Sequence, residues 1–508
     1  MARARPPTIE TSDTPPATGG QIARGAAWLV LFKLADRSVG FVSTMVLARL
    51  LAPADFGLVA MAMAVVAMSE LMSAFGFDTA IIQRQDARRA HYDTAWTFNV
   101  VFGVAVAMLL VLLSFPAAGF YQDPRLTPIL QVLALGALVS GFENIGTVAF
   151  RKQLDFRSEF RFLLFKRLAT FVVTIALAIS FRDYWALIAG VVTGKLASVW
   201  ISYRLHPFRP RLDLSARADL FHFSKWLLLS NTIQFIQTRS TDFIIGRTVG
   251  SHGLGIYTVA MEIATLPSTE LIAPLNRAVY PAYSRLAHDP AALRERFFEV
   301  FAMIALIALP VAFGLAVVAE PAVRVLLGAK WLETVPIIRV AALVGLVGAL
   351  QSNLYLVILA LGRPRANTLL AGTIALIALP AIVIASLRYG IIGAAWANFG
   401  AAIVSFIGIG IVFTRITGYP IRRIAAALWR PTLAALLMAA AVLPTDRALI
   451  ESGTDFAVFR LCLLIVIGSL TYSSGVLGCW WLAGMPEGAE SRAVDLLLRR
   501  VRPHPPPG

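Results

Sequence analysis

Charged residues stand inside the most apolar parts of this 508-residue chain. In the first long apolar segment, Lys33, Asp36, Arg37, Gly40 and Thr44 fall within about a third of a helix circumference at 100° per residue. If the segment crosses a membrane, each charge costs about 2.5–3.5 kcal/mol in lipid, so this stripe must face protein or water. Lys33 and Arg37 could then hold a phosphate group. Lys33 and Asp36 are spaced to pair with each other, which would neutralise some of the charge. The other interpretation is a structural ion pair that docks this helix on its neighbours, but two cations against one anion favour binding.

A second polar set lies on one face of the apolar segment 220–248. Its amides and hydroxyls could bond sugar hydroxyls, or could bond neighbouring helices for only about 0.6 kcal/mol per pair. So many polar groups exceed what helix packing needs, which favours a water-filled cavity. The set is Asn231, Gln234, Thr238, Thr241 and Asp242, with Arg239 beside them.

Carboxylates near mid-membrane depth form a third set. A buried carboxylate has a raised proton affinity unless a cation pairs with it, so these acids could couple transport to a proton or cation gradient. Pairing with Lys195, Arg239 or Arg277 is the equally weighted alternative. The acids concerned are Glu70, Glu262 and Glu270. Lys195 lies at mid-depth in the segment 184–205 and is expected to face the helix bundle.

We therefore predict a transport cavity rather than a catalytic centre. The predicted substrate-binding residues are Lys33, Arg37, Lys195, Asn231, Gln234, Thr238, Arg239 and Arg277. The predicted ion-coupling or cavity acids are Asp36, Glu70, Asp242, Glu262 and Glu270. No catalytic residue, metal site or cofactor is predicted, because the sequence holds no metal-spaced cysteine or histidine set and Gly190–Lys195 is one residue short of a phosphate-binding loop.

The composition explains which elements must position these residues. Apolar residues make up 58% of the chain and charged residues 15%, with a mean hydropathy of +0.73. Soluble chains carry about 25% charged residues, so a soluble enzyme and a disordered protein are excluded. The apolar runs are too long and too uniform for barrel strands. The expected fold is therefore an all-α polytopic membrane protein with about fourteen transmembrane helices. The predicted segments are 25–51, 55–82, 92–117, 126–150, 160–181, 184–205, 220–248, 253–281, 295–319, 333–361, 366–387, 390–414, 425–445 and 456–484.

The charge distribution fits this topology. The chain has 45 lysines and arginines against 29 aspartates and glutamates, a net charge of +16. With the N-terminus in the cytoplasm and fourteen alternating helices, every inner loop is basic and no outer loop holds a basic cluster. The positive charge is thus accounted for by topology, and nucleic acid is excluded as a partner. We predict a multi-pass membrane protein with both termini in the cytoplasm.

An internal repeat divides the chain. Residues 49–63 align with residues 247–261, so that Arg49 matches Arg247, Gly57 matches Gly255 and Met63 matches Met261. Six predicted helices separate the copies, which predicts two parallel six-helix lobes, an arrangement typical of secondary transporters. The predicted domains are a tail 1–24, an N-lobe 25–205, an inner loop 206–219, a C-lobe 220–415, two further helices in 416–485, and a tail 486–508.

Particular sequence strings carry a family resemblance. Residues 47–57 (LARLLAPADFG) and 75–83 (FGFDTAIIQ) resemble the Wzx-like oligosaccharide flippases of bacterial polysaccharide biosynthesis, within the multidrug/oligosaccharidyl-lipid/polysaccharide exporter superfamily. Residues 238–247 (TRSTDFIIGR) and 255–257 (GIY) resemble the seventh-to-eighth helix region of the same family. The resemblance implies two lobes around a V-shaped cavity, alternating access, and an undecaprenyl-pyrophosphate-linked oligosaccharide as substrate.

The expected function is therefore a flippase of the bacterial inner membrane for lipopolysaccharide O-antigen, capsule or exopolysaccharide assembly, which works by alternating access coupled to an ion gradient. The expected partners are membrane lipids, a polyprenyl-pyrophosphate-linked glycan, and the polymerase and glycosyltransferases of the pathway. A cation-coupled multidrug antiporter of the same superfamily is the alternative, and it predicts an acidic cavity. A membrane polymerase, ligase or glycosyltransferase is disfavoured because the predicted outer loops are short. The glycan, the coupling ion and the oligomeric state stay open.

Overall fold

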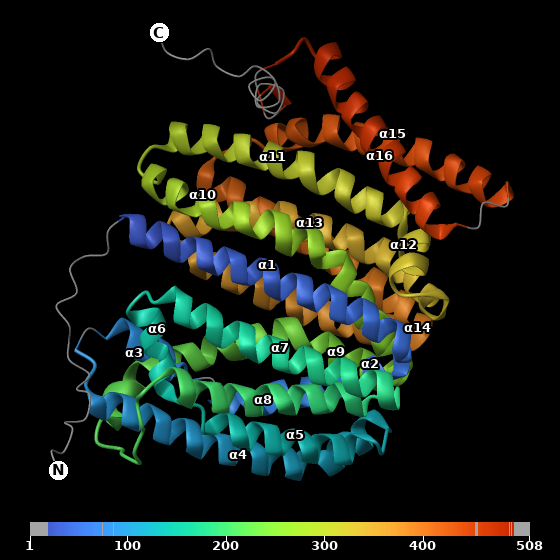
Figure 1. Ribbon diagram of the computed structural model, residues 1–508. Coiled ribbons are helices and arrows are strands. Elements are labelled where there is room, and N and C mark those ends of the chain that lie inside the picture. Colours follow the sequence, from blue (N-terminus) through green and yellow to red (C-terminus); the bar gives the residue numbers. More distant parts are fainter. Residues whose placement is uncertain are drawn as a thin grey trace, which may run out of the picture. The chain divides into compact units, whose positions relative to one another are not determined.

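The computed structural model is helical throughout its regular secondary structure, in the part of the chain that it describes (Figure 1). The described residues are 19–73, 75–84, 86–452, 456–486, 488 and 490–491. Most of the two predicted tails therefore lies outside the described residues. By contacts, the chain divides into two compact units, Met1–Gly255 and Ile256–Gly508. The predicted lobe boundary in the 206–219 loop is a different division and stays a prediction.

The first unit is built from long helices that follow one another with short connections. In Figure 1, α4 and α5 lie side by side, as do α7 and α8. Its elements are α1 (Gly19–Leu50), α2 (Pro53–Glu70), η1 (Leu71–Ser73), α3 (Phe77–Gln83), α4 (Arg89–Tyr121), α5 (Leu126–Gly141), η2 (Ile145–Thr147), α6 (Val148–Lys152), α7 (Phe156–Phe181), α8 (Trp185–Leu205) and most of α9 (Arg217–Pro267).

The second unit continues from the end of α9. Its core is formed where α11, α13 and α15 pack together, around buried aromatic residues such as Phe297, Phe301 and Phe413. Its elements are η3 (Ser268–Ile272), α10 (Ala273–Leu286), α11 (Pro290–Val317), α12 (Ala319–Leu326), η4 (Ala329–Thr334), α13 (Val335–Ala360), α14 (Pro364–Thr417), α15 (Ile421–Glu451) and α16 (Ala457–Leu482).

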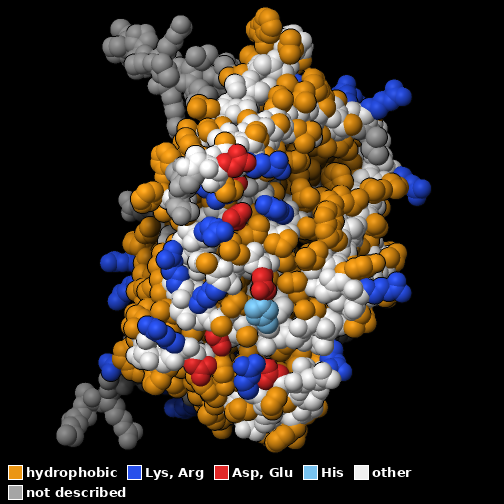
Figure 2. Space-filling view, turned by 90° about the vertical axis from the view of Figure 1, so that its right-hand side faces the viewer, with side chains coloured by type: hydrophobic (Ala, Val, Ile, Leu, Met, Phe, Trp, Pro, Cys, Tyr) orange, Lys and Arg blue, Asp and Glu red, His pale blue; other side chains and the backbone are white. Residues whose placement is uncertain are grey.

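The protein is a multi-pass membrane protein. Among the described residues, nine helices are long and apolar enough to cross a membrane, or ten if the bent pair Leu126–Gly141 and Ile145–Lys152 is one span. Large apolar side chains are exposed along these helices, Leu112 and Leu376 being more than 70% exposed, and Figure 2 shows hydrophobic side chains across much of one face. The all-helical membrane fold is thus confirmed, and the count of fourteen crossings stays a prediction.

Two glycines separate predicted helix pairs. The long helix α9 breaks at Gly250, with φ 85° and ψ −176°, and α14 breaks at Gly390, with φ 61° and ψ −149°. Positive φ is readily adopted only by glycine. These breaks fall between the predicted segments 220–248 and 253–281, and between 366–387 and 390–414, so each pair was separated correctly.

Two other predicted helices are broken where one continuous helix was expected. The segment 55–82 ends as a helix at η1 and restarts at α3 after Gly76, which has a φ of 66°. The segment 126–150 bends by 65° between α5 and α6. At that bend the Asn144 side chain accepts a hydrogen bond from the Gly146 backbone N–H at 2.9 Å and caps η2. Both breaks lie beside the polar residues described below.

The repeated turns pack against each other within the first unit. A Cβ atom on Gly57 would overlap the carbonyl oxygen of Ser251, and a Cβ atom on Gly255 would overlap the carbonyl oxygen of Pro53. Ser251 is the repeat equivalent of Pro53, so the two contacts are equivalent as well. Glycine is required at both positions because the two backbones meet without space for a side chain.

Candidate transport cavity

An ion pair joins α2 to α8 in the first unit. Lys195 Nζ lies 3.2 Å from Glu70 Oε1, and the two side chains are 31% and 43% exposed. The Lys195 side chain lies beside Gly136 of α5. A Cβ atom on Gly136 would be in ordinary van der Waals contact with it. The structure therefore pairs Glu70 with one of the three cations considered as its partner.

This ion pair borders a cavity of about 430 Å³ between α2, η1, α4 and α5. Polar side chains line it together with small residues, and the volume is within the range of sites that hold small ligands. The polar lining residues are Glu70, Ser73, Asn99 and Ser140. A carboxylate, an amide and two hydroxyls thus face one space inside a bundle of apolar helices.

The polar face of α8 continues beyond Lys195. The Ser198 hydroxyl donates to Glu143 Oε2 at 2.5 Å, and the Ser202 hydroxyl accepts from the Asn144 backbone N–H at 3.0 Å. Lys195, Ser198 and Ser202 are spaced by three and four residues, which puts them on one side of the helix. The helix α8 therefore holds the segment between α5 and η2 through polar contacts.

A second ion pair joins α1 to α7. Arg167 Nε lies 3.0 Å from Asp36 Oδ1, so Asp36 docks α1 on a neighbouring helix, as the structural interpretation of the stripe expected, and does not pair with Lys33 on its own helix. Gly40 explains the difference, because a Cβ atom there would lie 2.6 Å from Arg167 Nη2. The missing side chain lets Arg167 reach α1. Lys33 is exposed and makes no hydrogen bond or ion pair with a described residue, and Arg37 is half-buried on the same helix.

The polar face of α9 is partly exposed. Arg239 Nη1 lies 3.3 Å from Asp242 Oδ2 within the same helix, and the Thr238 hydroxyl donates to the Gln234 carbonyl at 2.9 Å. Gln234, Thr238 and Arg239 are exposed, whereas Asn231 is half-buried. Both of these contacts lie within α9. They therefore leave amide and hydroxyl groups on the surface of the helix, where a ligand can meet them.

The polar residues of the predicted segment 253–281 do not share one environment. Glu262, Thr269, Glu270 and Arg277 are exposed, whereas Asn276 is buried and donates to the Ser352 hydroxyl at 2.7 Å. The cause is η3, a π-helical turn directly after Pro267, which changes the residue spacing along the helix. Among the described residues, Arg277 has no ion-pair partner. The Thr269 hydroxyl donates to Glu270 Oε1 at 3.0 Å.

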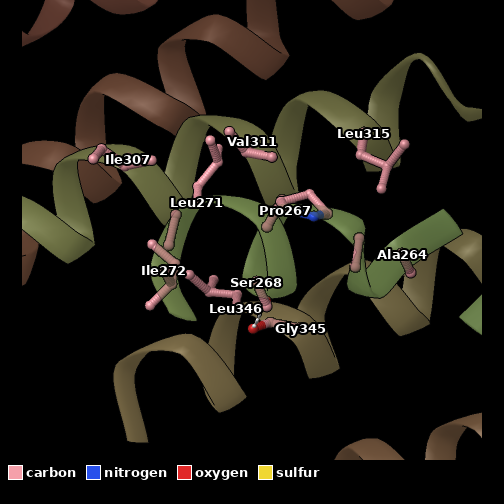
Figure 3. Close-up of a pocket in the computed structure, with 13 residues that line it drawn as sticks. Ala264, Pro267, Ser268, Leu271, Ile272, Ile307, Val311, Leu315, Gly345 and Leu346 are labelled. Carbon is pink, nitrogen blue, oxygen red and sulfur yellow. Dashed lines mark hydrogen bonds between the residues drawn. The ribbon is translucent and has the colours of Figure 1, made fainter. Parts of the chain in front are cut away.

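The π-helical turn also borders an apolar crevice in the second unit. Figure 3 shows Leu271, Ile272, Ile307 and Val311 around it, while the Ser268 hydroxyl donates to the Gly345 carbonyl at 2.9 Å. Its interior measures about 10 Å³, which is room for a single water molecule. The crevice is thus a packing feature rather than a substrate site.

Several residues that line the cavity or make the polar contacts around it were not predicted. They are Asn99, Ser140, Glu143 and Arg167. Ser198 and Ser202 could have been found from their spacing to Lys195 on one helix face. The other contacts join helices that are far apart in the sequence, and such contacts leave no periodic pattern in the sequence.

The comparisons identify the family. The family described as "Polysaccharide biosynthesis protein" matches residues 46–336, more than half of the chain. This chain belongs to the polysaccharide biosynthesis protein family. The resemblance of residues 47–57 and 75–83 to Wzx-like proteins is thereby confirmed.

Relatives within this family cover most of the chain. It is 25% identical to the lipopolysaccharide biosynthesis protein WzxC of Escherichia coli (strain K12), over 80% of this chain and 84% of that protein. It is 28% identical to the teichuronic acid biosynthesis protein TuaB of Bacillus subtilis (strain 168), over 68% of this chain and 73% of that protein.

A solved structure shares the fold of this family member. The inward closed conformation of the lipid II flippase MurJ matches with a TM-score of 0.72, at 15% identity, over 89% of this chain and 99% of that one. At this identity the likeness concerns the fold alone. It extends well beyond the residues that the family match covers.

Proposed function

We propose that this protein is a flippase that moves a lipid-linked oligosaccharide across the bacterial inner membrane for surface polysaccharide assembly. The observation that carries the proposal is the Glu70–Lys195 pair beside a polar cavity of about 430 Å³ in an apolar helix bundle. A transported headgroup needs such a space, because its charges and hydroxyls would otherwise enter lipid unpaired. The names of WzxC, TuaB and MurJ support this substrate class.

The proposed substrate is an undecaprenyl-pyrophosphate-linked glycan. Lys33 and Lys195 supply ammonium groups and Arg37 a guanidinium group for the pyrophosphate. The exposed amide and hydroxyl groups of Gln234 and Thr238 supply partners for sugar hydroxyls. The proposal puts both termini in the cytoplasm and has the glycan loaded from the cytoplasmic side, on which it is assembled.

The proposed coupling uses the same ion pair. A pyrophosphate that engages Lys195 competes with Glu70 for that ammonium group. The released carboxylate is then left without its cation, so a proton or another cation can take the place of Lys195. Substrate and ion then occupy the site together, and an ion gradient drives the cycle. This protein is accordingly a transporter rather than an enzyme.

The drug-antiporter alternative needs an acidic cavity that attracts organic cations. Here the Glu70 carboxylate is neutralised by Lys195, and Lys33 adds a further cation on α1. This balance of charge favours an anionic substrate.

The test measures the lipid-linked glycan pool and the surface polysaccharide of a deletion strain complemented with variants. We expect the deletion strain and Lys195→Ala to accumulate single glycan repeat units on the lipid and to lose surface polysaccharide. Arg388→Ala is the matched control, because Arg388 is an exposed arginine of the second unit outside the cavity. Wild-type pools and wild-type surface polysaccharide in the deletion strain would contradict the flippase. Accumulation of long glycan chains would place the block at a later step.

A further inference from the structure

The second unit holds a large arginine-lined cavity that shares no residue with the proposed transport cavity. It measures about 790 Å³ and lies between the N-terminal parts of α11 and α15, with Gly488, Glu490 and Ser491 as its remaining wall. Arg294 projects from α11, while Arg423 and Arg430 project from α15. Because both helices begin here, their N-terminal dipoles add positive potential to that of the side chains.

Three carboxylates share this cavity, but two of them already have partners. Arg296 Nη1 lies 2.9 Å from both oxygens of Glu299. Arg430 Nη1 lies 3.0 Å from Glu490 Oε1, with the two side chains only 16% and 6% exposed. The third, Glu295, is exposed at the rim and makes no ion pair with a described residue.

Two arginines remain without an acidic partner in the described part of the chain. The Arg294 guanidinium lies over the Tyr419 ring and the Arg423 guanidinium lies over the Phe298 ring, each 6.0 Å from the ring centre. Stacking on a ring holds a guanidinium in place and leaves its N–H groups directed outward for a planar, two-pronged acceptor. The cavity therefore offers preorganised donors for an anion larger than the carboxylate that it holds.

We propose that this cavity binds a phosphate ester, with Arg294, Arg423 and Arg430 as ligands, and that Glu490 occupies it as an internal competitor. Arginine matches phosphate oxygens with paired hydrogen bonds, and these are stronger than its bond to a single carboxylate oxygen. Binding displaces Glu490 from Arg430 and opens the wall formed by Gly488, Glu490 and Ser491. The proposal does not depend on the substrate that the protein transports.

The phosphate of a membrane lipid is the source that the surroundings favour. The apolar side of the cavity is formed by Phe298, Ala426 and Ala427. On the same helix, Trp429 and Leu433 are exposed, and apolar side chains of this kind suit the acyl chains below a lipid headgroup. A soluble phosphate has the same headgroup chemistry without the chains, so the two sources can be separated by experiment.

The test uses the full-length protein in nanodiscs of phosphatidylcholine, with and without phosphatidylglycerol, and counts retained lipids by native mass spectrometry. We expect Arg294→Gln combined with Arg423→Gln to weaken phosphatidylglycerol binding at least about tenfold, because two charge-assisted contacts are lost. Glu490→Gln is expected to strengthen it several-fold, since the competing charge is removed. Arg388→Gln is the matched control, since it removes an exposed arginine elsewhere in the second unit.

A second arm adds inorganic phosphate to protein in phosphatidylcholine alone. Arginine-dependent binding of phosphatidylglycerol supports the site with a lipid as its ligand. Arginine-dependent binding of inorganic phosphate, without a preference for phosphatidylglycerol, supports the site with a soluble ligand. Binding that is unchanged in both the arginine double variant and Glu490→Gln overturns the proposal. If the double variant fails to fold, the response of Glu490→Gln alone decides it.

Discussion

Glu70 and Lys195 illustrate how a residue pair can serve transport without contributing much to stability. Both side chains are about a third or more exposed, so their attraction is screened, and pairs of this kind are worth about 0–1 kcal/mol. Their conspicuous feature is the cavity beside them rather than the strength of their bond. A structural pair and a substrate-binding pair should consequently respond differently to exchange of the two charges.

We predict that Glu70→Lys combined with Lys195→Glu does not restore surface polysaccharide. The exchange keeps an ion pair between α2 and α8 but moves the cation from α8 to α2, where it no longer meets the phosphate in the same way. Surface polysaccharide is measured in the complemented deletion strain, and membrane insertion is checked by immunoblot. Recovery to the wild-type level by the exchange would show that the pair only joins two helices.

At this scale the sequence predicted residue types better than their partners. Lys195 was recognised because a lysine at mid-depth must have a polar neighbour. Asp36 and Lys33 are spaced to pair on one helix face, and the structure pairs Asp36 with Arg167 instead. Helical spacing identifies candidates within one helix, whereas Gly40 admits a partner from another helix that spacing cannot reveal.

At the scale of elements, a buried ion pair fastens α16 to α15. Arg460 donates from Nε and Nη2 to the two carboxylate oxygens of Asp446, at 2.6 and 2.8 Å, and the side chains are only 9% and 14% exposed. Removing one partner of a buried pair leaves the other charge uncompensated, whereas replacing both with apolar residues is often neutral. These last two helices thus have a definite structural connection, although their role was left unassigned from the sequence.

We therefore predict that Arg460→Ala destabilises the protein by about 3–5 kcal/mol. Thermal unfolding in detergent measures the effect as a lowered midpoint. The matched control is Arg460→Met combined with Asp446→Leu, which removes both charges and should recover most of the stability. An Arg460→Ala midpoint equal to that of the wild type would contradict the assignment.

The connection between α8 and α9 contains a histidine whose charge state matters. Burial lowers the pKa of His206, and the Arg209 guanidinium lowers it further. Its Nδ1 accepts a hydrogen bond from the Phe208 backbone N–H at 3.2 Å, which requires the neutral ring. Because the folded pKa lies below the unfolded value of about 6.5, stability is complete above that pH and decreases as pH falls toward the folded pKa.

We predict faster amide hydrogen exchange in residues 206–211 at pH 5 than at pH 7.5, after correction for the intrinsic rates. His206→Asn keeps an acceptor for the Phe208 N–H but does not titrate, so its corrected exchange should be independent of pH. The same pH dependence in His206→Asn would assign the effect to another group.

The helices themselves were predictable because apolar runs bounded by proline, glycine and charge leave few alternatives in lipid. The breaks inside these helices were harder to predict from the sequence. The break at Gly250 was found because it lies between two apolar runs, whereas the bend before η2 depends on Asn144, whose side chain caps η2 and also donates to the Phe208 carbonyl at 2.8 Å. A polar residue near a helix end gives no sign from sequence alone that it will cap a bend.

At the scale of the whole molecule, the two copies of the internal repeat contact each other. The backbones of the turns at Gly57 and Gly255 meet directly, and alternating access requires turns on one side of the membrane to separate during the cycle. We predict that Gly57→Val disfavours the closed contact, because its side chain overlaps the Ser251 carbonyl. Thiol labelling of Ser251→Cys should then be several-fold faster than in the background with Gly57.

Gly372→Val is the control for that experiment, since a Cβ atom on Gly372 meets nothing within 4 Å. Equal labelling rates in the Gly57→Val and Gly372→Val backgrounds would mean that the turns tolerate the side chain without separating. Labelling of the native Cys462 and Cys479 provides the reference in each protein.

The equivalence of the Gly57 and Gly255 contacts also has a historical meaning. Position 53 of one copy touches position 57 of the other, and the reverse holds, which is the rule for an interface between identical subunits related by a two-fold axis. A half-length ancestor that paired with itself would have formed both contacts from a single glycine codon. If two such halves were then joined in one gene, each codon could mutate alone, and the paired contact would last only while both glycines were kept.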